Sequence, residues 1–350
     1  MFRFPQLPRI PTEEELRQHI ATIAPLPAGV ERPFWSVMIP TYNRPEYLRQ
    51  ALESVLTQDP GPDRMQIQVS DNFSTVADIE ALVRRIGRGR VEYYRQPKPF
   101  SDNWTTCIRH SRGQWIHLLH DDDMVLPGFY SAYERVIAAN PRLVMVGGRA
   151  VRMDKDGQWT APANEDARAD EFFEAYASES IDCGLKTTTV AVKRDAYERL
   201  GGLCDLFTFC GDTELWLRIA MSGPFARTGR RHMLYREHPG SDFVQRVASG
   251  IHMIETYLLT AIHLGRLRGR PLTKAELRRC RSEIAARATQ WAWILEARGS
   301  SEGRLNLALV AWMLEPRLTT ATMLAKSWIK HRLWPKTPSP SEFAALFDRS

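Results

Sequence analysis

Apolar runs and helical patterns alternate along the first third of the chain. Four short runs have the composition and length of buried strands: 34–39, 65–69, 91–95 and 115–119. The segments between them predict three helices, because their apolar residues recur on one face: 47–56, 76–86 and 102–110. Strands and helices that alternate at this spacing are typical of a mostly parallel sheet with helices on both faces. We therefore predict an α/β fold.

The pattern after residue 127 is less regular. It predicts, in order, a helix to about 139, a strand at 143–151, a turn at Asp156-Gly157, a loop and helix around 172–176, a strand at 187–192 and a helix at 211–221. The polar and acidic segment 160–182 is expected to border an acceptor site.

The two ends of the chain differ from this central part. Residues 1–34 hold six prolines around one short helix, which begins at a capping box formed by Thr12 and Glu15 and is expected to end near Ala24. Four helices are predicted near the other end: 251–267, 273–297, 302–314 and 318–334. The domains predicted in this way are an N-terminal arm at 1–34, an α/β domain at 35–249, a helical module at 250–335 and a tail at 336–350.

The composition is that of an ordinary globular protein. Of 350 residues, 43% are apolar and 25% charged, which argues against disorder or a fibre. The five cysteines have no paired metal-ligand spacing, so we expect reduced thiols. The longest apolar segment, 305–314, is too short to span a bilayer, and no leader-like run opens the chain. These features predict a cytoplasmic protein.

Positive charge is concentrated toward the C-terminus. Residues 251–350 hold 16 Lys and Arg against 8 Asp and Glu, whereas residues 1–250 hold 31 against 33. Five tryptophans interleave with these basic residues: Trp291, Trp293, Trp312, Trp328 and Trp334. The mixture favours contact with an anionic membrane surface. The alternative is a helical bundle with tryptophans in its core. Nucleic acid is not favoured, because no recognition motif accompanies the charge.

Three consecutive aspartates, Asp121, Asp122 and Asp123, come just after the apolar run at 115–119. Neighbouring carboxylates repel and raise one another's pKa, so such a cluster is stable only in water or beside a cation. Oxygen ligands of this kind suit Mg²⁺ or Mn²⁺, which keep positions open for phosphate oxygens. The aspartates therefore predict a divalent metal site. The alternative is a solvated acidic turn before the next helix.

Polar residues follow three of the predicted strands: Thr41–Arg44, Asp71–Asn72 and Asp121–Asp123. The carboxyl ends of parallel strands share one edge of the sheet, where α/β proteins bind their ligands. Carboxylates, amides and an arginine at such an edge suit a nucleotide, with a metal across its diphosphate. No P-loop is present and no G-x-G-x-x-G follows the first strand, so ATP hydrolysis and dinucleotide binding are not favoured.

Four motifs in this order resemble those of family 2 glycosyltransferases of the GT-A fold. They are Ser36-Val-Met-Ile-Pro-Thr-Tyr-Asn-Arg44, Val69-Ser-Asp-Asn72, Asp121–Asp123 and Gly211-Asp-Thr-Glu-Leu-Trp-Leu-Arg218. The resemblance covers about residues 35–245. It implies a GT-A fold, Rossmann-like with a mostly parallel mixed sheet flanked by helices, whose donor half is 35–126 and acceptor half 127–249.

The resemblance also implies roles for single residues. Those that would hold the nucleotide are Pro40, Thr41, Tyr42, Asn43, Arg44, Asp71, Asn103 and Asp122. Those that would hold Mn²⁺ or Mg²⁺ are Asp121, Asp123 and His238. A surface histidine is an equal alternative for His238.

Asp212 opens a predicted helix, where the pattern alone favours a helix cap. The resemblance implies instead that Asp212 is the general base that deprotonates an acceptor hydroxyl, a contribution of roughly 10²–10⁴ in rate. Related enzymes carry Glu-Asp at this point, but here Gly211 precedes the aspartate.

The resemblance implies an inverting, metal-dependent transfer of a sugar from a nucleoside diphosphate sugar to a glycan or lipid-linked glycan acceptor. It also implies bacterial surface polysaccharide synthesis, at the cytoplasmic face of the inner membrane. Two alternatives remain. Asp121-Asp-Asp-Met-Val125 also fits the nucleophile motif of haloacid-dehalogenase-like phosphatases, although it follows the fourth strand. Gly211 would suit a non-catalytic scaffold that binds a sugar nucleotide.

Overall fold

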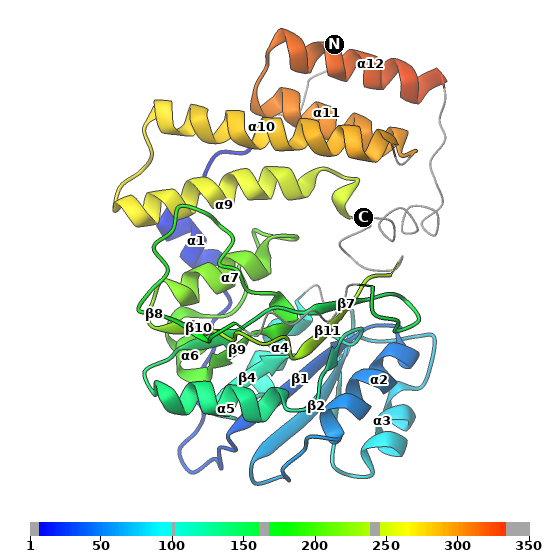
Figure 1. Ribbon diagram of the computed structural model, residues 1–350, viewed down its shortest axis with the longest axis vertical. Coiled ribbons are helices and arrows are strands. Elements are labelled where there is room, and N and C mark those ends of the chain that lie inside the picture. Colours follow the sequence, from blue (N-terminus) through cyan, green and yellow to red (C-terminus); the bar gives the residue numbers. More distant parts are fainter. Residues whose placement is uncertain (1–6, 100–101, 161–167, 239–245, 298, 334–350) are drawn as a thin grey trace.

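The computed structural model describes residues 7–99, 102–160, 168–238, 246–297 and 299–333. An α/β layer lies below a stack of C-terminal helices (Figure 1). Within the described residues, the main sheet has eight strands in the order β3-β2-β1-β4-β9-β6-β10-β8. The prediction of an α/β fold with a C-terminal helical stretch is confirmed.

The first four strands of the sheet are parallel. They are β1 (Trp35–Thr41), β2 (Met65–Asp71), β3 (Glu92–Arg95) and β4 (Trp115–Leu118). Helices connect them: α2 (Pro45–Leu56), α3 (Ile79–Gly87) and α4 (Asn103–His110). Alternate side chains of β1 enter opposite cores, since Val37 packs with α2 and α3 whereas Met38 packs with α4. The sheet is therefore buried on both faces.

The second part of the sheet has strands of both directions. It contains β6 (Met145–Gly147), β8 (Glu171–Phe173), β9 (Ala191–Lys193) and β10 (Phe225–Arg227). Strand β9 is antiparallel to both β4 and β6, so β6 runs in the same direction as β4. Strand β10 is parallel to β6. The carboxyl ends of β1, β2, β4, β6 and β10 consequently face one edge.

A smaller sheet crosses above that edge. It has the order β5-β11-β7, with β5 (Met124–Val125), β7 (Val151–Met153) and β11 (Met233–Arg236). Strand β11 brings its end to the aspartates, because β5 begins directly after Asp123 and pairs with β11. Three further helices flank the sheets: α5 (Phe129–Ala139), α6 (Arg194–Leu200) and α7 (Gly211–Ala220).

The C-terminal helices are α9 (Ile251–Arg268), α10 (Lys274–Ala297), α11 (Ser301–Leu314) and α12 (Leu318–Leu333), and they share a third core. The guanidinium of Arg266 on α9 pairs with Glu13 on α1 (Glu13–His19) and with the fully buried Glu214 on α7. This ion pair ties the arm and the helices to the α/β layer. Of the helices in the described ranges, none is long and apolar enough to cross a bilayer.

Several element predictions are confirmed. The capping boxes of Thr12 with Glu15 and of Thr273 with Glu276 both form. The four C-terminal helices lie within two residues of their predicted ends wherever the structure describes them. The turn at Asp156-Gly157 is present, because Asp154 N–H donates to the carbonyl of Gln158. The tail at 336–350 lies outside the described residues, and the proposed domain boundaries stay predictions.

Other element predictions are wrong. The strand expected at 143–151 divides into β6 and β7 in different sheets, because residues 148–150 between them are not in a strand. The helix expected around 172–176 is instead strand β8, whose Phe173 stacks on Phe225 of β10 with ring centroids 4.7 Å apart. The segment 187–189 forms a 3-10 turn before β9. Helix α1 ends at His19 and not near Ala24.

Candidate functional site

The loop after β1 contacts the first aspartate. Thr41 Oγ1 donates to Asp121 Oδ2 over 2.7 Å, and the N–H of Tyr42 approaches the same oxygen at 3.4 Å. The guanidinium of Arg44 lies 3.3 Å from Asp121 Oδ1 and 2.9 Å from Asp122 Oδ2. Two of the strand ends that the sequence placed together are therefore in direct contact, and Arg44 offsets part of the acidic charge.

Asp122 has a second neighbour, the ring of His238. His238 Nε2 lies 3.0 Å from Asp122 Oδ2, and both side chains are almost fully covered. Burial opposes ionisation of Asp122, but the hydrogen bond from His238 and nearby positive charge lower its pKa to about 2. The predicted role of His238 as a metal ligand stays a prediction, because its ring already binds this carboxylate.

Asp123 and His120 each have a buried side-chain atom that makes no hydrogen bond to a described residue. Asp123 Oδ1 accepts the N–H of Arg236 over 2.8 Å. Asp123 Oδ2 and His120 Nε2 are buried, and neither has a hydrogen-bond partner among the described residues. Ligand atoms of His120, Asp122 and Asp123 lie within 4.8 Å of one another. Two carboxylates and an imidazole with unsatisfied atoms fit a divalent cation.

The pKa values of the other two aspartates are raised. Burial and the charge of Asp122 raise the pKa of Asp121 to about 6, although Arg44 opposes the shift. Burial and the same charge raise the pKa of Asp123 well above its usual value. Burial also lowers the pKa of His120, despite the nearby carboxylates. The positive charge near the cluster is therefore too small to favour ionisation of all three carboxylates.

The predicted nucleotide-binding residues Asp71 and Asn43 make hydrogen bonds to neighbouring residues of the protein. Asp71 Oδ2 accepts from Tyr93 and Arg95, and its Oδ1 accepts from the N–H of Ser74. Asn43 has a positive φ of 57° and its side chain accepts from the N–H groups of Thr75 and Val76. These bonds join the loops after β1 and β2, so both residues shape the edge at which a nucleoside would bind.

Three further predicted nucleotide-binding residues differ in exposure. Asn103 is buried behind β2, where its amide binds the hydroxyl and carbonyl of Ser70. Tyr42 is half-exposed and free to stack on a base. Pro40 lies within β1 and fixes the direction of the loop. Their contact with a nucleotide stays a prediction, as it does for Thr41, Arg44 and Asp71.

Asp212 lies in the first turn of α7. Its Oδ2 accepts the hydroxyl of Thr187 over 2.7 Å, and its Oδ1 accepts the N–H of Thr213 over 2.6 Å. The N-cap residue is Cys210, which makes no side-chain capping bond, so Asp212 does not occupy the cap position. Burial lowers the pKa of Lys186, and the carboxylates of Asp123 and Asp212 oppose that shift. The side chain of Lys186 therefore interacts electrostatically with both the metal cluster and Asp212.

The turn before Asp212 is held by the C-terminal helices. Both carboxylate oxygens of the buried Glu255 on α9 accept backbone N–H groups, from Thr208, Phe209 and Cys210, over 2.8–2.9 Å. Gly211 has ordinary backbone angles, and a Cβ there would come no closer than 3.5 Å to Leu203. Neither crowding nor an unusual backbone angle therefore requires the glycine that replaces the family's Glu.

The sequence analysis missed three residues of this site: His120, Lys186 and Arg236. Arg236 is 1% exposed. Its backbone N–H donates to Asp123, and its guanidinium donates to the carbonyl of Asp122 and to the side chain of Gln50. His120 directly precedes the aspartates, which was the available signal. Nothing local distinguished Lys186 or Arg236, because the residues that they face in this site are at least 26 residues away in the sequence.

Comparisons with known proteins agree with this geometry. Residues 36–201 match the family described as glycosyl transferase family 2. The crystal structure of S. aureus TarS 1–349 with UDP-GlcNAc has a TM-score of 0.57 and 12% identity, over 85% of this chain and 91% of that one. Its UDP complex gives 0.54 and 11% over the same shares. At this identity the likeness shows the fold alone. No curated protein sequence matches the chain.

A mannosyltransferase from Pyrobaculum calidifontis, solved with GDP-Man and Mn²⁺, is less similar. Its TM-score is 0.48 at 17% identity, over 96% of this chain and 90% of that one. This likeness is too weak to bear on the metal of the present protein.

The fold is that of the GT-A glycosyltransferases. The match of residues 36–201 to glycosyl transferase family 2 supports a family 2 glycosyltransferase.

Proposed function

We propose that the protein is an inverting, metal-dependent glycosyltransferase that moves a sugar from a nucleoside diphosphate sugar to an acceptor hydroxyl. One observation carries the metal dependence: the buried atoms Asp123 Oδ2 and His120 Nε2, beside Asp122, make no hydrogen bond to a described residue. A divalent cation held there would stabilise the negative charge that develops on the leaving diphosphate. Asp121 and His238 remain candidate ligands on the same edge.

The protein's own residues suit the other parts of the reaction. Tyr42 and Asp71 lie where the nucleoside would bind, on the loops after β1 and β2. Asp212 would accept the proton of the attacking hydroxyl, and Thr187 orients its carboxylate. The acceptor oxygen would then bond to the anomeric carbon from the side opposite the diphosphate, whose bond to that carbon breaks. This displacement gives inversion, which NMR of the product's anomeric proton would test.

We place the reaction in bacterial surface glycan synthesis, next to an anionic membrane. Helix α12 supports this location because Trp328 and Ile329 are half-exposed and alternate with three exposed basic residues, Lys326, Lys330 and Arg332. Trp293 is also half-exposed, whereas Trp291 and Trp312 are partly covered; Trp334 lies outside the described residues. Co-sedimentation with vesicles that contain anionic lipid, compared with neutral vesicles, tests the contact. Equal binding to both would contradict it.

Donor binding tests the proposed function directly. UDP-, GDP- and dTDP-sugars are titrated by calorimetry and thermal unfolding, each with Mn²⁺, Mg²⁺ or EDTA. A ligand at about a hundredfold excess over its Kd should raise the free energy of unfolding by about 2.7 kcal/mol. We expect one nucleotide class to bind, and to bind at least tenfold more tightly with a metal.

Asp123→Ala is the matching variant. It should lose both the metal-dependent part of donor binding and turnover, whereas Asp63→Ala, an exposed aspartate, should behave as the wild type. Wild-type activity in Asp123→Ala would overturn the metal assignment. A folded protein that binds no donor would contradict the proposed function. Hydrolysis of an aryl phosphate that is lost in Asp121→Asn would support a phosphatase instead.

A further inference from the structure

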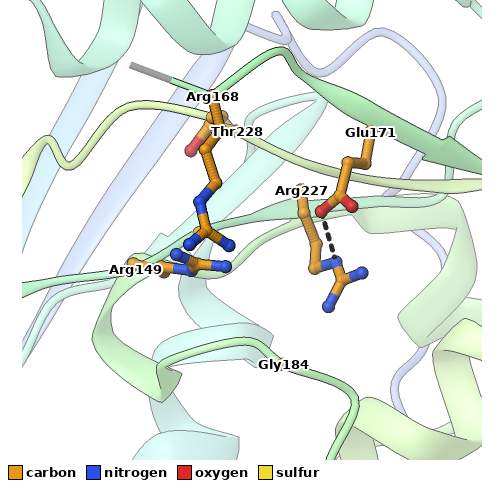
Figure 2. A pocket seen from close by; sticks show the side chains of 8 residues that line it. Arg149, Arg168, Glu171, Gly184, Arg227 and Thr228 are labelled. Atoms are coloured by element: carbon orange, nitrogen blue, oxygen red, sulfur yellow. Dashed lines mark ion pairs between the residues drawn. The ribbon is translucent and has the colours of Figure 1, made fainter. Parts of the chain in front are cut away.

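A basic pocket lies farther along the same sheet edge, at the carboxyl ends of β6 and β10. It is a small pocket that is open to solvent. Three arginines reach it: Arg149 after β6, Arg168 before β8 and Arg227 at the end of β10. Figure 2 shows the side chains of Arg149 and Arg168 converging in the pocket. Glu171 supplies the only carboxylate among the described residues that line it.

The arginines of this pocket are incompletely neutralised. Glu171 Oε2 lies 3.1 Å from Arg227 Nε, but the buried Nε makes no hydrogen bond to any described residue. Within the described ranges, no carboxylate pairs with Arg149 or Arg168. Guanidinium groups that converge in this way repel one another unless an anion lies between them. The pocket therefore has the charge of a site for a phosphate or carboxylate group.

The pocket is a built feature of the fold. The N–H of Gly229 donates to Asp170 over 2.8 Å, which fixes the chain next to Arg168. A Cβ at Gly229 would overlap the carbonyl of Arg168, so glycine is needed for this approach. The guanidinium of Arg227 lies 4.7 Å from the centre of the Phe173 ring, which holds it in place. Packing therefore holds the side chain of Arg227, and backbone contacts hold the main chain at Arg168.

A short segment connects the pocket with the proposed base. Gly184 lines the pocket, and Thr187, three residues later, binds Asp212. Between them, the N–H of Lys186 donates to the carbonyl of Gly148, another residue of the pocket wall. The donor loops lie at the other end of the sheet, on β1 and β2. The metal cluster already serves the donor diphosphate, so an anion in this pocket belongs to a different molecule.

We propose that this pocket binds an anionic group of the acceptor, so that the enzyme glycosylates an acidic glycan or a phosphate-containing polymer. The proposal rests on the proposed function for its acceptor, but anion binding can be measured without turnover. The pocket is small and open to solvent, so it suits a single phosphate or carboxylate group and not a whole ligand.

The test uses the full-length protein with Mn²⁺ and the nucleoside diphosphate that it binds, or the protein alone if none binds. Glycerol 3-phosphate, glucuronate and neutral glycerol are titrated at constant ionic strength. We expect at least one anion to bind and glycerol not to bind. Stronger binding of glycerol 3-phosphate points to a phosphodiester acceptor, and stronger binding of glucuronate points to an acidic sugar.

Arg149→Gln with Arg168→Gln should weaken anion binding at least tenfold and leave donor binding unchanged. Arg142→Gln is the matched control, because Arg142 is an exposed arginine of the same domain that pairs with Glu174. Arg149→Gln alone replaces the double variant if that variant does not fold. The proposal is overturned if the wild type binds neither anion, if the variant binds them equally well, or if the variant loses donor binding instead. If no nucleotide sugar binds but the anions do, the proposed function is contradicted and the anion site is not.

Discussion

The metal cluster and the basic pocket lie at one edge of the same sheet but are built in different ways. In the cluster, Arg44 and His238 lie beside Asp121 and Asp122, whereas Asp123 Oδ2 makes no hydrogen bond to a described residue and has the ring of His120 3.6 Å away. In the basic pocket, the described lining residues include three arginines and one glutamate. The first arrangement is short of positive charge and the second is short of negative charge. Each imbalance indicates the charge of the ligand that would correct it, a cation in one and an anion in the other.

Asp212→Asn should have the largest effect, and that effect should be on the rate of sugar transfer. Loss of the proposed base should lower the rate of transfer by roughly 10²–10⁴. Donor binding should stay unchanged, because Asp212 contacts Thr187 and Thr213 and none of the donor loops. Steady-state kinetics with the best donor measure the effect. The exposed Asp205→Asn serves as control, and a wild-type rate in Asp212→Asn would show that another residue is the base.

The next largest effect should be on the pH dependence of stability. The arginines of the basic pocket do not titrate in the usual pH range, whereas strand β4, which leads to the metal cluster, carries a buried histidine. Burial lowers the pKa of His117 to about 4. Since this lies below the value near 6.5 of the unfolded chain, the unfolded chain binds more protons. Stability that is present above about pH 6.5 is therefore lost as the pH falls toward 4, by up to roughly 3 kcal/mol.

His117→Gln should flatten that loss in denaturant unfolding between pH 7 and pH 4. The neutral amide can still donate to the carbonyl of Thr188, as His117 Nε2 does over 2.9 Å. His19→Gln is the control, because the ring of His19 is partly exposed and pairs with Asp205. Equal pH slopes for wild type and His117→Gln would contradict the assignment.

Glu171→Gln tests the basic pocket and should produce the smallest change. Removal of the pocket's carboxylate should tighten anion binding about two- to fivefold, since exposed ion pairs are worth about 0.2–1 kcal/mol. The titration of glycerol 3-phosphate and glucuronate measures it. Glu174→Gln, which removes the exposed partner of Arg142, should leave anion binding unchanged. Weaker binding in Glu171→Gln would mean that the pocket does not act as an anion site.

The sequence was sufficient for features that depend on periodicity. Alternating strands and helices predicted the parallel half of the sheet, and parallel pairing then placed Thr41 and Arg44 beside Asp121. Residues whose roles depend on distant pairing were not predictable in this way. Arg236 reaches Asp123 only because β11 pairs with β5. The basic pocket also escaped notice, since its arginines come from three separate segments and none forms a motif.

Strand β8 illustrates a second limit. Phe172 and Phe173 suggested one face of a helix, but a short apolar pair does not distinguish the two periods. Stacking of Phe173 on Phe225 decides in favour of a strand, and this contact cannot be read from the local sequence.

Helix α9 affects how this protein can be divided for experiments. A fragment that ends near residue 250 would keep every proposed site residue. It would also leave Glu214 without one of its two arginine partners and expose the loop at 208–210, whose N–H groups Glu255 now accepts. The segment that carries the family match is therefore a poor choice for a minimal enzyme. A fragment intended for crystallisation or screening should extend beyond Arg266.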